Sequence, residues 1–306
     1  MTEHAGAKAA VERVDDPMTT SPVALSPGTA IKWDGLLARV EKLGSVIVAF
    51  SGGVDSALVA HAAFMTLGTH AVAATGLSQT YADEEMTEAK AIAAEIGIEH
   101  VMVTTMELTD PRYADNTHQR CFFCKSELYG RLKTLAAERG IAHVLDGANA
   151  DDLADFRPGG RAARDFSVIS PLEEAGLTKA EVRALSAAFG LRTWDKPAMA
   201  CLSSRFAYGD PITTEKLARV AAAERAIKAL GFRGFRVRHH DSLARVEFRP
   251  DDLDRAWERR EAISSAVRGA GYRQVAIDLD GYRAGSQNEG LGARLTTIGL
   301  RPTGPG

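Results

Sequence analysis

Short apolar runs alternate with amphipathic stretches along the first half of the chain. Runs typical of buried strands cover residues 45–50, 71–77, 100–104 and 143–145. Apolar residues at helical spacing predict helices over residues 54–67, 83–96 and 122–139. This alternation predicts an α/β fold in which helices cover both faces of a parallel sheet. The ligand of such a sheet lies at the carboxyl ends of its strands.

The pattern changes in the second half of the chain. Thr178 and Glu181 have the Thr-x-x-Glu spacing of a capping box, which predicts a helix that ends near Gly190. Residues 194–211 are rich in Pro, Gly and Ser and indicate a functional loop or an interdomain linker. A smaller α+β unit is predicted beyond them, with a helix from Thr213 or Thr214 to Leu230, strands over residues 235–239, 244–248 and 275–279, and a helix over residues 253–269.

The first strand of this unit carries charges at alternate positions. The alternation places Arg236 and Arg238 on one face and Phe235 and Val237 on the other, so the arginine face is expected to be free to hold an anion. The net charge of the chain is −3, yet residues 200–306 hold more basic than acidic side chains, and most of the basic ones are arginine. The planar arginine fork suits carboxylates and phosphates, although a solvated basic face is an equal alternative.

The start of the chain follows neither pattern. The first 27 residues show no periodicity and no apolar segment of a signal peptide, so residues 1–30 are expected to form a disordered leader. No run approaches the ~18 apolar residues that cross a bilayer, so no membrane partner is expected. With three cysteines and no export signal, the protein is expected to be cytoplasmic.

A polar loop, Ser-Gly-Gly-Val-Asp-Ser at residues 51–56, joins the first predicted strand to its helix. Its glycines let backbone N–H groups close on an anion, and the helix directs its positive end to the same place. The loop lacks the Gly-Lys-Ser/Thr ending of a Walker A motif. It resembles the PP-loop of ATP pyrophosphatases, which transfer AMP and release pyrophosphate with Mg²⁺. The residues expected to bind the pyrophosphate portion of ATP are Ser51, Gly52, Gly53, Asp55 and Ser56.

Two further strand ends are expected to face the nucleotide. Gly76, near the end of the second strand, is expected to lie beside the adenosine. Gly147 and Asp151 follow the fourth strand in a segment whose carboxylates are candidates to hold Mg²⁺ or to orient the substrate, although an Asx-rich turn is the favoured explanation of this segment taken alone. Together with residues 170–172 and the helix start near Thr178, the segment resembles the corresponding region of NAD and GMP synthetases.

The cysteines give the second chemical signal. Cys121 and Cys124 form a CxxC pair at the start of a predicted helix, and Cys201 stands alone. A third thiolate brought in by folding would complete three ligands of an iron–sulfur cluster and leave one iron open. A redox or zinc CxxC and buried inert cysteines are the alternatives.

The sequence around Cys201, WDKPAMACLSSRFAYG, carries a more specific resemblance. With Glu224, Arg236-Val237-Arg238 and residues 281–289, it is similar to the LarE family of ATP-dependent sulfur transferases, which build the thiocarboxylates of the nickel-pincer nucleotide cofactor. The resemblance covers residues 33–295. It implies an adenine nucleotide alpha hydrolase-like PP-loop domain over residues 31–200, a sulfur-transfer and substrate domain over residues 201–295, and a tail over residues 296–306.

The resemblance also implies a mechanism. ATP would adenylate a carboxylate of pyridinium-3,5-biscarboxylic acid mononucleotide, which makes its carbonyl open to a sulfur nucleophile. The residues implied as catalytic are Cys201, Asp55, Glu224 and Arg205. The arginines implied to hold the substrate phosphate and carboxylates are Arg205, Arg236, Arg238 and Arg283, and Glu224 is implied to hold a cation.

The family has two branches that differ in the origin of the sulfur. In one, a single cysteine matching Cys201 loses its own sulfur and becomes dehydroalanine. In the other, three cysteines bind a [4Fe-4S] cluster whose open iron carries a sulfide. Because Cys121 and Cys124 accompany Cys201, the chain is expected to belong to the cluster branch, with a sulfur source that the sequence does not identify. The family also implies a homo-oligomer.

Other functions compete with this interpretation. A tRNA-thiolating PP-loop enzyme also combines such a loop with a CxxC pair and a third cysteine, but the overall negative charge and the lack of a recognisable RNA-binding module favour no nucleic-acid partner. An ammonia-using amide synthetase needs no cysteine. A regulatory protein that only binds ATP is the alternative outside enzymes.

Overall fold

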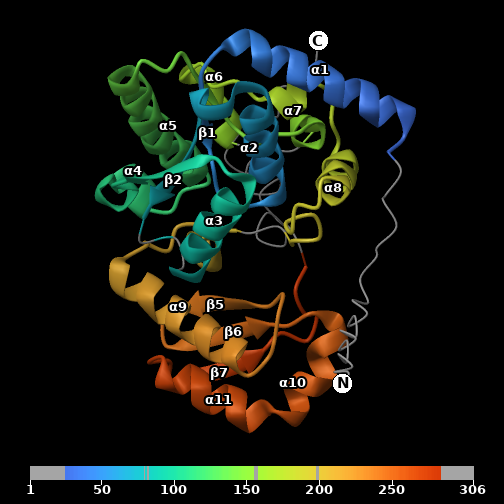
Figure 1. Cartoon of the computed structure of the whole chain (residues 1–306). Coiled ribbons are helices and arrows are strands. Elements are labelled where there is room, and N and C mark those ends of the chain that lie inside the picture. Colours follow the sequence, from blue (N-terminus) through green and yellow to red (C-terminus); the bar gives the residue numbers. More distant parts are fainter. Residues whose placement is uncertain (1–24, 79, 81–82, 155–157, 198–199, 284–306) are drawn as a thin grey trace, which may run out of the picture.

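The computed structural model describes residues 25–78, 80, 83–154, 158–197 and 200–283. Its larger sheet has four parallel strands in the order β3-β2-β1-β4 (Figure 1). The strands are β1 (Val46–Ala49), β2 (Ala71–Leu77), β3 (Glu99–Thr104) and β4 (His143–Leu145). The predicted parallel sheet is therefore confirmed, and all four strands direct their carboxyl ends to one edge.

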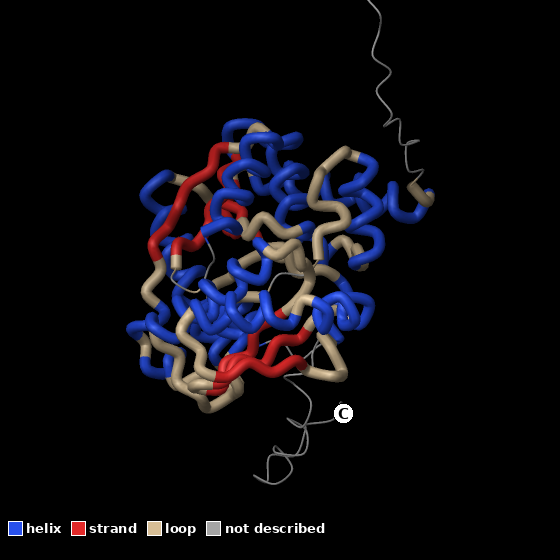
Figure 2. The backbone as a smooth tube through the Cα atoms, turned by 90° about the horizontal axis from the view of Figure 1, so that it is seen from below, coloured by secondary structure: helices blue, strands red, loops and turns tan. Residues whose placement is uncertain are grey.

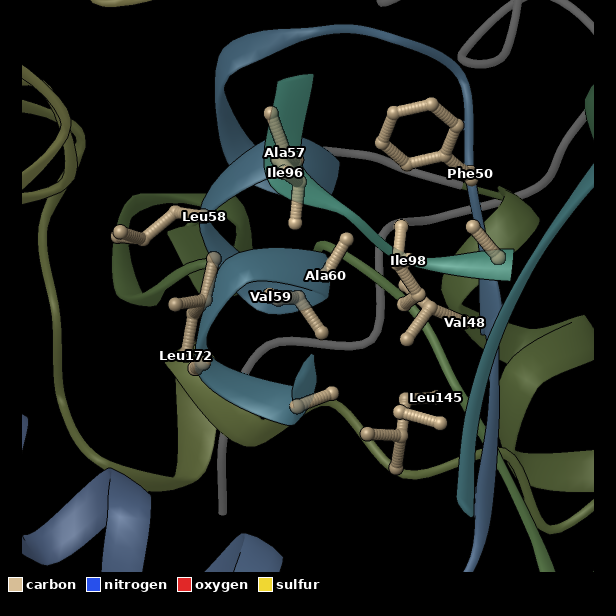
Figure 3. Close-up of a cluster of buried hydrophobic side chains, with 14 of the residues drawn as sticks. Val48, Phe50, Ala57, Leu58, Val59, Ala60, Ile96, Ile98, Leu145 and Leu172 are labelled. Carbon is tan, nitrogen blue, oxygen red and sulfur yellow. The ribbon is translucent and has the colours of Figure 1, made fainter. Parts of the chain in front are cut away.

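Helices cover both faces of this sheet, because its central strand is apolar on both sides. Val46 and Val48 of β1 contribute to one buried cluster, and Ile47 and Ala49 contribute to the other. The first face is covered by α1 (Pro27–Leu43), α2 (Val54–Leu67), α3 (Asp83–Ile96), α7 (Pro171–Glu174) and α8 (Lys179–Ala188). The second face is covered by α5 (Arg120–Arg139) and α6 (Pro158–Asp165). Figure 3 shows part of the first cluster, with Val48 and Leu145 of the sheet opposite Val59 of α2.

The second unit has a sheet of its own. Its strands are β5 (Arg236–His240), β6 (Leu243–Glu247) and β7 (Gln274–Ile277), paired antiparallel between β5 and β6 and parallel between β6 and β7. Its helices are α9 (Thr214–Ala229), α10 (Leu253–Glu258) and α11 (Arg260–Gly269). Figure 2, the view from below, shows the strands of the chain in two separate groups. The predicted α+β unit is confirmed.

The chain between the two sheets packs against both units. Ile212 donates its N–H to the carbonyl of Ala114 in α4 (Pro111–Ala114), and the Asn116 amide donates to the carbonyl of Ala207 at 2.7 Å. Phe206 forms a parallel bridge with His239 of β5. These contacts fix the segment that carries Cys201 between the two units.

In the described parts of the chain, no helix is both long and apolar enough to span a bilayer.

Two predicted boundaries were wrong. The leader expected over residues 1–30 is too long, because α1 begins at Pro27 with Ser26 as its N-cap; residues 1–24 lie outside the described residues. The helix expected over residues 253–269 is divided into α10 and α11 at Arg259, which adopts a non-helical φ of −98° and ψ of 15°. Residues 284–306, which include most of the motif at 281–289 and the predicted tail, also lie outside the described residues.

Candidate functional site

The PP-loop forms a ready anion site at the start of α2. The N-cap residue Gly53 has no side chain to accept from the first N–H groups of the helix, so these donors are left for a ligand. The loop is held from inside by Ser56, whose hydroxyl accepts from the Ser51 N–H at 3.2 Å and donates to the Gly53 carbonyl at 3.2 Å. The predicted pyrophosphate residues therefore lie in one preorganised turn, and their role in binding stays a prediction.

Two glycines in and beside this loop have no room for a side chain. Gly52 has a φ of +68°, and a Cβ there would lie 3.1 Å from the backbone of Ala89 in α3. A Cβ on Gly147 would lie 2.9 Å from the Ser56 nitrogen. The absence of a side chain at Gly147 therefore lets the segment after β4 pack closely against the PP-loop.

Two lysines that the sequence analysis missed also reach the PP-loop. The Lys179 ammonium forms an ion pair with Asp55, which accepts a second hydrogen bond from the Asn149 amide at 3.1 Å. The Lys196 ammonium donates to the Gly52 carbonyl at 2.9 Å. The loop lacks a lysine of its own, but the fold supplies two from distant segments. Their only sequence signals are that Lys179 follows the capping-box threonine and that Lys196 belongs to the WDKP motif.

The other residues predicted beside the nucleotide occupy the same edge of the sheet. The Asp151 carboxylate accepts from the Lys179 N–H at 2.9 Å and so caps the start of α8. Gly76 lies near the end of β2, where an added Cβ would come within 3.2 Å of Leu128. The predicted roles of Asp151 in Mg²⁺ binding and of Gly76 beside adenosine stay predictions.

The three cysteines belong to one neighbourhood. Burial raises the pKa of the Cys124 thiol, and the charges of Cys201, Glu107 and Cys121 raise it further. Cys124 packs against an apolar cluster that includes Leu202, the residue after Cys201. The charge of Cys201 therefore acts on both thiols of the CxxC pair, and the sharing of one cluster by the three cysteines stays a prediction.

The segment that carries Cys201 is anchored through the two residues that follow this cysteine, Leu202 and Ser203. Leu202 donates its N–H to the Thr80 carbonyl at 3.1 Å. Ser203 shares a 2.6 Å hydrogen bond with the buried hydroxyl of Tyr113. Thr80 is held in turn by Glu107, a carboxylate only 3% exposed that accepts from the Thr80 hydroxyl at 3.2 Å. Cys201 is thereby the N-cap of an anchored turn, η4 (Leu202–Arg205).

The three free cysteines are sulfur donors of the kind that binds iron–sulfur clusters. No three or more His, Cys, Asp or Glu side chains of the described chain converge on a point where a single metal ion would sit. A cubane cluster makes a different demand, because each cysteine binds a separate iron and the sulfurs need not meet at one point. The residues that would hold such a cluster are Cys121, Cys124 and Cys201.

Arg205 and Glu224 form a buried bidentate ion pair beside Cys201. The Arg205 guanidinium donates from Nε and Nη2 to the two Glu224 carboxylate oxygens at 2.8 and 2.9 Å, and from Nη1 to the Cys201 carbonyl at 3.1 Å. Glu224 Oε1 also accepts from the Val237 N–H at 3.0 Å. In this state both Glu224 oxygens are engaged by the protein, so the predicted cation would have to compete with Arg205.

The arginine face of β5 is more engaged than the sequence predicted. Arg238 forms a buried ion pair with Glu247 at 2.7 Å and donates to the Ser204 carbonyl. Arg236 lies over the Tyr282 ring at 4.8 Å, and the side chain of the next residue, Arg283, is exposed. The predicted separation of faces is confirmed, because Phe235 and Val237 belong to the core of the second unit. The expectation that the arginine face is free was wrong.

Removal of the Glu224 carboxylate is expected to destabilise the protein. Glu224→Ala leaves Arg205, which is 5% exposed, without its charged partner. The free energy of unfolding should fall by about 3 kcal/mol, because a buried charge is then uncompensated. Guanidinium unfolding followed by circular dichroism measures this change. Glu84→Ala, which breaks the exposed pair with Arg225 at 3.1 Å, is the matched control and should cost less than about 1 kcal/mol. Equal losses in the two variants would contradict the structural role of the buried pair.

Comparison with known proteins finds relatives that span nearly the whole chain and others that span half of it. Residues 33–136 match the family model of NAD synthase. An uncharacterized protein of Synechocystis sp. is 44% identical over 85% of this chain and 98% of its own length. The pyridinium-3,5-bisthiocarboxylic acid mononucleotide synthase of Lactiplantibacillus plantarum is 38% identical over 88% of this chain and 98% of its own. The tRNA-specific 2-thiouridylase MnmA of Rickettsia felis is 29% identical over 51% of this chain and 53% of its own length.

Proposed function

The chain belongs to the LarE family, and on this premise we propose that it adenylates a carboxylate of pyridinium-3,5-biscarboxylic acid mononucleotide and replaces the activated oxygen with sulfur. Membership makes it an ATP-using sulfur transferase of nickel-pincer nucleotide biosynthesis. The observation that supports the finer proposal is that one segment contacts both units: Lys196 donates to Gly52 of the PP-loop, and Arg205 donates to the Cys201 carbonyl and pairs with Glu224 of α9.

The ATP half of the reaction is supported by the charges around the PP-loop. The unpaired N–H groups at the start of α2 would bind the pyrophosphate portion of ATP. Lys179 and Lys196, held at the loop by Asp55 and the Gly52 carbonyl, would add positive charge as AMP is transferred and pyrophosphate leaves. Mg²⁺ would accompany the nucleotide and be held by the phosphates as much as by the protein.

The substrate half is supported by the second unit. Arg205, Arg236 and Arg238 gather beside Cys201, and their planar guanidinium groups match the phosphate and the carboxylates of the mononucleotide. The Nε–H of Arg238 is buried without an acceptor in the described chain, so a further donor remains for an anion. Arg283 is proposed to contribute from the rim.

The origin of the sulfur divides the proposal into two routes. In the favoured route, Cys121, Cys124 and Cys201 would hold a [4Fe-4S] cluster, which when bound would supply the sulfur from its open iron. Burial raises the pKa of both CxxC thiols and the charge of Cys201 raises it further, which supports this route. In the alternative, Cys201 attacks the adenylated carbonyl, and a C–S bond forms as the C–O bond to AMP breaks. The Cβ–S bond of Cys201 then breaks with loss of the Cα proton, which leaves the thiocarboxylate on the substrate and dehydroalanine in the protein. This alternative requires only Cys201 and no cluster.

A tRNA-thiolating function is the weaker candidate. The thiouridylase match covers about half of this chain, whereas the mononucleotide synthase match covers 88% of it and so includes the second unit. Arg236 and Arg238, two of the arginines proposed to hold the substrate, belong to that second unit.

Exchange of labelled pyrophosphate into ATP tests the proposed adenylation. We expect exchange only when the pyridinium biscarboxylate mononucleotide is present, because reversal requires an acyl adenylate. A protein that only binds ATP gives no exchange with or without the mononucleotide. Exchange that depends on tRNA and not on the mononucleotide would refute the proposed substrate.

A further inference from the structure

One face of α3 is directed to the PP-loop and to the segment that carries Cys201. Ala89 packs against Gly52, where an added Cβ would lie 3.1 Å from the Ala89 backbone. Glu88 forms an ion pair with Lys196 at 2.9 Å. Glu85 precedes these two residues by three and four positions and so lies on the same face, one helical turn nearer the start of α3.

The start of α3 lies against the second unit. Glu84 forms an ion pair with Arg225 of α9 at 3.1 Å, and Figure 1 shows α3 between the larger sheet and the elements α9 and β5. Glu85 is thereby placed between the PP-loop contact of α3 and the pair formed by Arg205 and Glu224. In the proposed function the acyl group passes from ATP at the PP-loop to sulfur at Cys201, so it would cross this interval.

The charges that face Glu85 come from every element around it. Arg205 of η4, Glu224 of α9, Arg236 of β5 and Lys196 of the connecting loop all act on its carboxyl. Burial raises the pKa of Glu85, against the opposing charges of Arg205 and Lys196. Within the described chain, no hydrogen bond or ion pair engages the Glu85 carboxylate directly. Its carboxyl group is partly buried, and its neighbours Lys196, Arg205 and Glu224 are already paired with other groups.

We propose that Glu85 recognises the positively charged pyridinium ring of the substrate and makes the site select pyridinium nucleotides over nucleotides with a neutral ring. This inference rests on the proposed function, because it assigns a partner to the ring of that substrate. The substrate carries a cationic ring between anionic carboxylates and a phosphate. Arginine side chains are suited to bind the anionic groups of the substrate. A carboxylate that lies among these arginines is suited to bind the cationic ring.

The same arrangement excludes competing ligands. An anionic nucleotide without a ring cation would gain the arginine contacts but would meet the Glu85 carboxylate without compensation. A neutral ring would leave this partly buried carboxylate desolvated and unpaired. Glu85 is therefore a specificity-determining residue, distinct from the groups that hold ATP or supply sulfur.

Two nucleotides that differ only in ring charge test the inference. Nicotinic acid mononucleotide has a pyridinium ring, and its 1,4-dihydro form has the same carboxylate and phosphate on a neutral ring. Binding of each to the full chain at pH 8 is measured by isothermal titration calorimetry. We expect wild-type protein to bind the pyridinium form about tenfold more tightly, which corresponds to about 1.4 kcal/mol. Equal affinity for the two forms would overturn the inference and leave the proposed function standing. Failure to bind either form would instead count against the proposed substrate class.

Glu85→Gln separates charge from shape. The variant should lose the preference by binding the pyridinium form about tenfold more weakly, with the dihydro form unchanged or bound more tightly. Glu84→Gln removes the same charge one residue away, where the partner is the half-exposed Arg225, and should keep the wild-type preference. The inference is wrong if Glu85→Gln keeps the preference or weakens both forms equally. Thermal unfolding of both variants establishes that each is folded.

Discussion

Replacement of Cys201 by alanine is expected to abolish sulfur transfer while pyrophosphate exchange continues. Both routes to the product require this sulfur, either as a ligand or as the donor. The backbone contacts that hold the Cys201 turn, from Leu202 to the Thr80 carbonyl and from Arg205 to the Cys201 carbonyl, do not involve the thiol. Thiocarboxylate product is measured by mass spectrometry and exchange by labelled pyrophosphate. Retained product formation in Cys201→Ala would remove Cys201 from the mechanism.

Cys121→Ala distinguishes the two sulfur routes. If three cysteines hold a cluster, this variant should lose iron and sulfide, and multiple-turnover transfer should fall with them. Iron and sulfide analysis after anaerobic reconstitution, together with the absorption spectrum, gives a readout independent of activity. Full sulfur transfer by an iron-free Cys121→Ala protein would reject the cluster route. Loss of hydrogen sulfide from Cys201 in the intact mass would then identify the sacrificial route.

Gly147→Ala is expected to disable ATP use. The new Cβ would lie 2.9 Å from the Ser56 nitrogen and 3.2 Å from the Asp55 carbonyl carbon, both of them backbone atoms that cannot rotate away. The PP-loop must shift to admit it, and displacement of a binding group by about 1 Å can cost on the order of 100-fold in rate. Pyrophosphate exchange should fall by at least about that factor.

Gly35→Ala is the matched control for this substitution. Gly35 is an exposed residue inside α1, and a Cβ there meets nothing within 4 Å. Alanine at this position should raise the free energy of unfolding by about 0.5–1 kcal/mol and leave exchange unchanged. Equal exchange rates in Gly147→Ala and Gly35→Ala would show that the contact with the PP-loop is unimportant.

Local sequence signals were sufficient to predict most of the fold. The strand β2 and the helices α2 and α3 have the predicted bounds, because apolar periodicity and flanking turns define them within a short window. The capping box at Thr178 is present as predicted, since its two hydrogen bonds link residues only three apart. Ser26 and Pro27 are residues typical of an N-cap and a first helical position, so they also indicate the start of α1. The prediction instead assigned them to the polar leader.

Which residues come together in the site depends on long-range contacts that no local sequence pattern encodes. Lys179 reaches Asp55 across 124 positions, and Lys196 reaches Gly52 across 144. Glu85 and Glu107 resemble ordinary helix and turn residues in the sequence, and only folding places Glu107 beside the thiols. The expectation of a free arginine face failed for the same reason, because Glu247 pairs with Arg238 from the neighbouring strand.

The most direct test of the proposed reaction is the mass of the nucleotide product. Anaerobically reconstituted protein is incubated with ATP and pyridinium-3,5-biscarboxylic acid mononucleotide. The nucleotides are then separated and their masses are measured by mass spectrometry. The account predicts AMP, pyrophosphate and a mononucleotide in which one carboxylate oxygen has been replaced by sulfur. A mononucleotide of unchanged mass, with AMP formed only when tRNA is added, would contradict it.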